Sequence, residues 1–132
     1  MAGVLVNQGE TIALEALVNK TAPQDLSLRL YTNNYTPVEA TTEASVTEAT
    51  GNGYAAKSLT ASSWVTTAGD PSDVTYPEQT FTFTGALGNV YGYYLTQNTS
   101  SKLIIAELFS DGPYDVQNNG DEIKVTVKIE LS

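Results

Sequence analysis

The carboxylate residues, Asp and Glu, are the residues of this sequence most able to carry out chemistry. The chain contains 15 Asp and Glu residues. They lie closest together at three places, Asp70/Asp73, Asp111/Asp115 and Asp121/Glu122. Loop carboxylates can bind calcium, which takes several oxygen ligands, but none of these places has the spacing of an EF-hand loop. Because Asp beside Gly or Pro is typical of turns, we predict turns and no cofactor, with a calcium site as the alternative.

A pair of carboxylates could also hydrolyse a glycosidic bond, if an acid and a base or nucleophile face each other across a cleft. A chain of 132 residues without His is a poor candidate for tuning such a pair. The absence of His and Cys also excludes zinc fingers, thiolate nucleophiles, Ser-His-Asp triads and iron–sulfur sites. We therefore predict that the protein is not an enzyme.

The charge of the chain excludes a second group of functions. Six Lys and Arg against 15 Asp and Glu give a formal net charge of −9. Binding to a nucleic-acid backbone requires clustered basic residues, and no apolar run is long enough to span a bilayer. We predict neither a nucleic-acid partner nor a membrane partner.

Tyrosines are the other chemically notable residues, since the chain has eight. Those on predicted strands are expected in the core or on sheet faces, and Trp64 is expected in the core. Three others lie beside loops that contain Pro, namely Tyr35, Tyr76 and Tyr114. Tyrosine is enriched in protein interfaces, so these three are candidates for anchors in an interface or for platforms on which sugars stack. Packing within turns is the competing interpretation.

One helix is expected near the N-terminus. Asn7 followed by Glu10 has the spacing of a capping box. Leu14, Leu17 and Val18 then share one face, which we expect to be buried. The helix should end near Asn19–Lys20, because the following Pro23 disfavours helical structure before it.

Alternation of apolar and polar residues predicts strands in the rest of the chain. It is clearest from Ile123 to Leu131, and it also occurs at Leu26–Tyr31. The segments 80–84 and 90–95 are predicted to form a hairpin. About seven strands with turns at regular spacing indicate a mainly β fold, an antiparallel β-sandwich or jelly-roll-like domain with one short N-terminal helix. We predict one domain over residues 1–132, with residues 1–8 as an extended arm and residues 33–50 as a long surface loop.

Several stretches together resemble small virion structural proteins of tailed bacteriophages, of the capsid cement or decoration type. They span nearly the whole chain, and they are Asn7–Glu10, Leu28–Asn34 with Thr36–Pro37, Glu48–Leu59 leading to Trp64, Phe81–Gly85, Val90–Tyr94, Glu107–Phe109, Gly112–Tyr114 and Asn119–Asp121.

This resemblance implies a function that depends on surface contacts. A cement protein binds the outer surface of the major capsid protein shell and stabilises it by protein–protein contacts, and such proteins commonly form homotrimers at three-fold positions. The resemblance thus implies the capsid surface of a virion as the location. The N-terminal segment and the loops that bear tyrosines would contact the neighbouring molecule. The candidate interface residues are therefore Val4, Leu5, Val6, Tyr35, Tyr76 and Tyr114. The alternative is a small tail-fibre, receptor-binding or tail-associated module.

Overall fold

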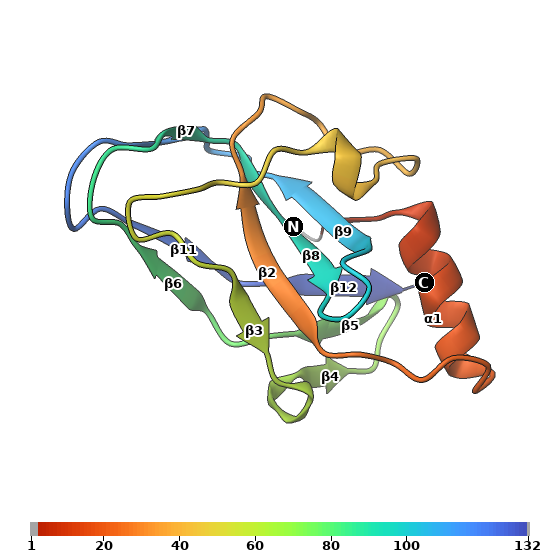
Figure 1. Ribbon diagram of the computed structural model, residues 1–132. Helices are drawn as coiled ribbons and strands as arrows, with labels where there is room; N and C mark the ends of the chain where they lie inside the picture. The colour runs from red at the N-terminus through yellow and green to blue at the C-terminus, as the bar shows by residue number, and fades with distance from the viewer. Residues whose placement is uncertain (1–2, 132) are drawn as a thin grey trace.

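The computed structural model describes residues 3–131 as a mainly β structure with one α-helix (Figure 1). In chain order the elements are β1 (Val4–Leu5), α1 (Asn7–Leu17), β2 (Leu26–Tyr31), the 3₁₀ turn η1 (Glu43–Ser45), β3 (Lys57–Leu59), the 3₁₀ turn η2 (Ala61–Ser63), β4 (Val65–Thr67), β5 (Ser72–Thr75), β6 (Gln79–Thr82), β7 (Gly88–Val90), β8 (Gly92–Gln97), β9 (Leu103–Leu108), β10 (Tyr114–Val116), β11 (Glu122–Val125) and β12 (Lys128–Leu131).

The strands form separate antiparallel sheets around a shared core. The largest has five strands in the order β1-β9-β8-β2-β3. A three-stranded sheet has the order β12-β5-β4, and two-stranded pairs form between β11 and β6 and between β10 and β7. This arrangement confirms the predicted fold class, a β-sandwich-like fold with a short N-terminal helix. The strands are shorter and more numerous than alternation predicted.

Strand β2 is an internal strand of the large sheet, between β8 and β3. Alternation predicted one apolar face, and Leu28 and Leu30 are indeed fully buried. The other face is not solvated, because Tyr31 is also fully buried and Ser27 nearly so. Loop 33–50 packs over Tyr31 and pairs with Arg29 through Glu48, and Ser27 donates to Asn98, so this face of β2 is largely covered by protein.

Two clusters of buried side chains hold the sheets together. The larger contains residues from most of the strands, including Leu28, Phe81, Phe83 and Val127. The smaller lies on the opposite face of the large sheet and includes Val6, Tyr31 and Tyr94. Burial of such side chains stabilises a fold by roughly 1.5–3 kcal/mol each.

The C-terminal alternation correctly predicted which side chains are buried. Ile123, Val125 and Val127 are all at most 3% exposed. The predicted single strand is nevertheless two strands, β11 and β12, which pair with different partners, β6 and β5. The predicted hairpin between 80–84 and 90–95 is wrong, because β6 pairs with β11 while β8 pairs with β2 and β9.

The N-terminal segment is part of the fold, which corrects the expectation of an extended arm over residues 1–8. Val4 and Leu5 pair with β9, and the Val6 N–H donates to the Ile104 carbonyl at 3.0 Å. Asn7 and Gln8 already belong to α1. Met1 and Ala2 lie outside the described residues. Deleting residues 1–8 would therefore remove a strand and a buried valine.

The predicted capping box is also wrong in detail. The helix begins at Asn7, its N-cap residue is Val6, and no side chain caps it. It ends at Leu17, two residues earlier than expected, and Asn19 adopts a positive φ of 58° after the C-cap. Within residues 3–131, no helix has the length and apolar character needed to cross a membrane.

Loop 33–50 does not reach away from the domain. Asn33 accepts a hydrogen bond from the Thr47 N–H and donates one to the Ser45 carbonyl, which folds the loop back on itself. A bidentate ion pair at 2.9–3.1 Å joins Arg29 to Glu48. The Tyr54 hydroxyl donates to the same carboxylate at 2.7 Å. These contacts fix the loop against β2.

Candidate functional site

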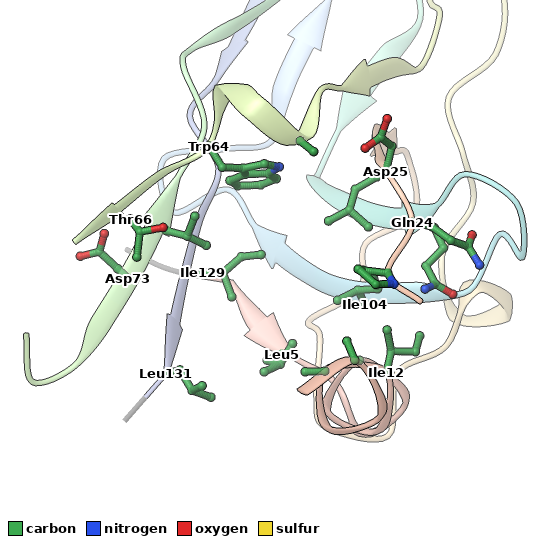
Figure 2. Close-up of a pocket in the computed structure, with 18 of the residues that line it drawn as sticks. Leu5, Ile12, Gln24, Asp25, Trp64, Thr66, Asp73, Ile104, Ile129 and Leu131 are labelled. Atoms are coloured by element: carbon green, nitrogen blue, oxygen red, sulfur yellow. The ribbon is translucent and has the colours of Figure 1, made fainter. Parts of the chain in front are cut away.

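The described residues form an apolar hollow of about 440 Å³. It lies between α1, the edge of the large sheet at β1 and β9, and the three-stranded sheet. In Figure 2, Leu5, Ile12, Ile104 and Ile129 point into it from these different elements. Concave apolar surfaces of this size are typical of binding sites, which makes this hollow the candidate site.

Packing of α1 forms one wall of the hollow. A Cβ at Gly9 would lie only 2.3 Å from the Ile104 carbonyl oxygen, so glycine alone allows the helix to approach β9 this closely. Ile12 and Ala16, on the same side of the helix, are half-buried and line the hollow. The helix therefore docks through its small residues.

The predicted buried face of α1 is exposed, which corrects the expectation from its spacing. Leu14, Leu17 and Val18 are 63%, 81% and 71% exposed. The preceding β1 and the close contact at Gly9 set the rotation of the helix, and this rotation turns its large apolar residues outward. The helix therefore exposes an apolar face in addition to the different side that lines the hollow, and exposed apolar surfaces mark interaction sites.

The opposite wall comes from the three-stranded sheet and Trp64. The Trp64 ring meets Tyr76 edge-on, with the ring centroids 5.0 Å apart. Trp64 was expected in the core, and it is instead half-buried and lines the hollow. Ile129 and Leu131 of β12 complete this wall, and Leu131 is 67% exposed.

Charged groups at the margin of the hollow are mostly acidic. Asp25 and Asp73 lie at its edge (Figure 2). On the face of β12 turned away from the hollow, the Lys128 ammonium lies 3.9 Å from the Asp73 carboxylate and 3.7 Å from that of Glu130. An apolar centre with a charged margin is the usual anatomy of a protein interface.

Tyr76 is not the exposed anchor that its loop position predicted. It is 6% exposed, and its hydroxyl accepts a hydrogen bond from the Thr60 N–H at 2.9 Å. This hydrogen bond lowers the pKa of Tyr76. Tyr35 is half-buried, its hydroxyl lies 2.9 Å from the Thr41 hydroxyl, and it packs against the smaller core cluster. Both tyrosines hold loops in place.

Tyr114 lies in a different place, beside a second hollow of about 190 Å³. Its ring packs on Phe109 at 4.6 Å between centroids. Its hydroxyl donates to Asp111, and this hydrogen bond raises the pKa of Tyr114 to about 12. The Tyr93 hydroxyl, buried next to this hollow, has no hydrogen-bond partner among the described residues.

The structure does not bring the six sequence candidates together. Leu5 alone lines the apolar hollow, Val4 is half-buried, and Val6 is fully buried and so presents no surface to a partner. Sequence reasoning missed Ile12, Trp64 and Ile129 as site residues. The available signal was the run of small residues in α1, Gly9, Ala13 and Ala16, which marks the side of a helix that packs closely.

The carboxylate clusters mostly organise turns. The Asp121 side chain accepts hydrogen bonds from the Gln117 and Asn118 N–H groups at 2.9 and 3.0 Å, and these bonds lower its pKa. Asp111 accepts the bond from Tyr114. Across residues 3–131, no three acidic side chains converge at a position that could hold a metal ion.

Comparison with known proteins gives no family. No protein-family model, curated protein or solved structure matches the chain. The geometry of the hollow and the resemblance noted in the sequence are therefore the basis for a functional proposal.

Proposed function

We propose that this chain is a capsid decoration protein of a tailed bacteriophage. It binds the outer surface of the major capsid protein shell and stabilises the shell by protein–protein contacts without catalysis. The observation that carries the proposal is the exposed apolar face of α1, Leu14, Leu17 and Val18, which the domain leaves uncovered in addition to the apolar hollow on another side of the helix. The chain carries a net charge of −9 and yet exposes this apolar surface. Such a surface is typical of a site that another protein covers.

The fold supports this proposal in a second way. α1 is fixed to β9 by the close approach at Gly9, and Trp64 packs edge-on against the buried Tyr76. The proposed interface is therefore presented by rigid elements. Rigid surfaces lose little conformational freedom on binding, which favours attachment.

Attachment to shells tests the proposal. Purified protein is mixed with shells that lack it, and the bound fraction and the thermal stability of the shells are measured. We expect saturable binding and shells that resist heat better. Val18→Asp should weaken binding about tenfold or more, because it puts a charge into the apolar contact. Val38→Asp is the matched control, since Val38 is also exposed, at 53%, but lies in loop 33–50.

Two outcomes would overturn the proposal. One is wild-type protein that does not bind shells. The other is binding that leaves shell stability unchanged. Equal binding by Val18→Asp and Val38→Asp would move the interface away from α1 while leaving the function itself standing.

A receptor-binding role is the second candidate, and the hollow beside Tyr114 favours it. Phe109 and Tyr114 are half-buried aromatic rings next to Asp111, an arrangement on which a sugar ring can stack and form hydrogen bonds. A glycan array probed with the wild type and with Tyr114→Ala tests this candidate. Binding that the variant loses would support a receptor-binding module, and an array without signal would remove it.

A further inference from the structure

Strand β12 has one edge with no neighbouring strand. It is the terminal strand of its sheet, and β5 is its partner on the other side. Among the described residues no strand pairs with the other edge of β12, and its Ile129 and Leu131 line the apolar hollow (Figure 2). Free edges present unpaired backbone groups that can pair with another chain.

The register shows which backbone groups face outward. The Tyr76 N–H donates to the Val127 carbonyl at 3.0 Å, which makes these two residues a hydrogen-bonded pair. Hydrogen-bonded and non-hydrogen-bonded pairs alternate along an antiparallel ladder. Lys128 opposite Thr75 and Glu130 opposite Asp73 are therefore non-hydrogen-bonded pairs. Their N–H and C=O groups point away from β5, toward the free edge.

The side chains of β12 divide between two faces. Ile129 and Leu131 line the hollow, while Lys128 and Glu130 lie on the opposite face and contact each other at 3.7 Å. Along the free edge the sequence is therefore Lys128-Ile129-Glu130, with the cation on one side of the apolar residue and the anion on the other. This pattern is complementary to itself when two such strands run in opposite directions.

We infer that a second copy of this chain pairs with β12 edge to edge, in antiparallel orientation about a two-fold axis. In this register Lys128 of one copy faces Glu130 of the other, and Ile129 faces Ile129. The facing Lys128 and Glu130 both have outward backbone groups, so each pair exchanges two N–H···O=C bonds across the interface. The interface is isologous, since the same patch serves on both copies.

Charge selects this register among the alternatives. A shift by two residues would place Lys128 opposite Lys128, or Glu130 opposite Glu130, and like charges directly opposite each other are destabilising. The chosen register instead gives two cross-strand ion pairs and keeps Ile129 on the apolar face. This pairing does not depend on binding to a shell, and it is two-fold, in contrast to the trimer that the resemblance implies.

Charge reversal tests the pairing, with molar mass in solution measured by light scattering and by sedimentation equilibrium. Lys128→Glu makes both facing positions acidic, and Glu130→Lys makes both basic. Each single variant should weaken dimerisation about tenfold or more, because two cross-strand pairs become repulsive. The double variant restores opposite charges and should dimerise like the wild type. A mixture of the two single variants should form a heterodimer.

Matched controls separate the pairing from a change in net charge. Lys102→Glu and Glu78→Lys make the same charge changes at exposed positions away from β12 and should dimerise like the wild type. Thermal unfolding of each variant shows that the monomer is still folded. A wild-type mass of twice 14.1 kDa with this pattern of loss and rescue supports the inference. A monomer, a mass of three times 14.1 kDa, or a dimer indifferent to the reversals would overturn it.

Discussion

Two regions of the molecule treat the same kinds of residue in opposite ways. Around β2 and β8, leucines and tyrosines are sealed beneath loop 33–50 or within the larger cluster, and all six residues of β8 are buried. Around β1, α1 and β12, leucines and isoleucines remain open to solvent at the hollow. This difference shows that the apolar residues of a segment do not by themselves tell whether the segment belongs to the core. Whether another element covers the face of a sheet or helix decides whether its side chains are buried.

A charge introduced into the buried region should cause the largest loss of stability. Val127 is 1% exposed and belongs to the larger cluster. We expect Val127→Asp to abolish cooperative unfolding, because an unpaired buried charge costs at least several kcal/mol and is comparable to the whole stability of a small domain. Thermal denaturation followed by circular dichroism measures this. Thr126→Asp, at the exposed neighbouring position, is the control, and a variant at 127 as stable as this control would contradict the placement of the strand.

A matched pair of leucines compares the two regions directly. Leu28→Ala should lower the free energy of unfolding by about 2–5 kcal/mol, because it leaves a cavity at a fully buried site. Leu17→Ala, at a position 81% exposed, should change it by less than about 0.5 kcal/mol. Urea denaturation gives both values. Similar losses for both variants would mean that the outer face of α1 is covered in solution.

The attachment of α1 can be tested at its closest contact. Gly9→Ala puts a Cβ against the Ile104 carbonyl, and the helix must shift to accommodate it. We expect a loss of about 1–3 kcal/mol, the usual cost of overpacking. Glu10→Ala, at the exposed next position, should be nearly neutral. A neutral result for Gly9→Ala would show that the helix is not held against β9.

The smallest effect concerns the turn at Asp121. Hydrogen bonds from the Gln117 and Asn118 N–H groups lower the pKa of Asp121 below its usual 3.8. A carboxylate with a lowered folded-state pKa stabilises the fold above its unfolded pKa, and this stabilisation is lost as the pH falls through the folded pKa. The melting temperatures of the wild type and Asp121→Asn should therefore converge as the pH falls below 3.8. A difference that is constant with pH would exclude this linkage.

The sequence predicted the strands whose environment is simple and failed where tertiary contacts decide. Alternation located the buried side of Ile123–Val127 because one side of that segment faces the core and the other faces solvent. It misjudged the face of β2 that carries Ser27 and Tyr31, because the loop that follows β2 folds back over Tyr31 and Ser27 donates to Asn98, 71 residues away in the sequence. The division into β11 and β12 follows from a change of pairing partner, which alternation does not encode.

The candidate site was hardly predictable from the sequence, for a related reason. Periodicity placed Leu14, Leu17 and Val18 on one face correctly, but it could not tell which way that face points. The contact between Gly9 and Ile104 sets that direction, and it joins positions 95 residues apart. The prediction that Tyr76 and Tyr35 are exposed anchors failed for a similar reason. Hydrogen bonds to Thr60 and Thr41 hold these two side chains within the structure.

The position of Trp64 has a practical consequence. It is the single tryptophan of the chain, and its ring forms part of the wall of the hollow. The intrinsic fluorescence of the molecule therefore originates at the place where we expect a partner to bind. Any occupant that displaces water from the indole should shift the emission to shorter wavelength, so the native protein carries its own optical reporter of occupancy without a label.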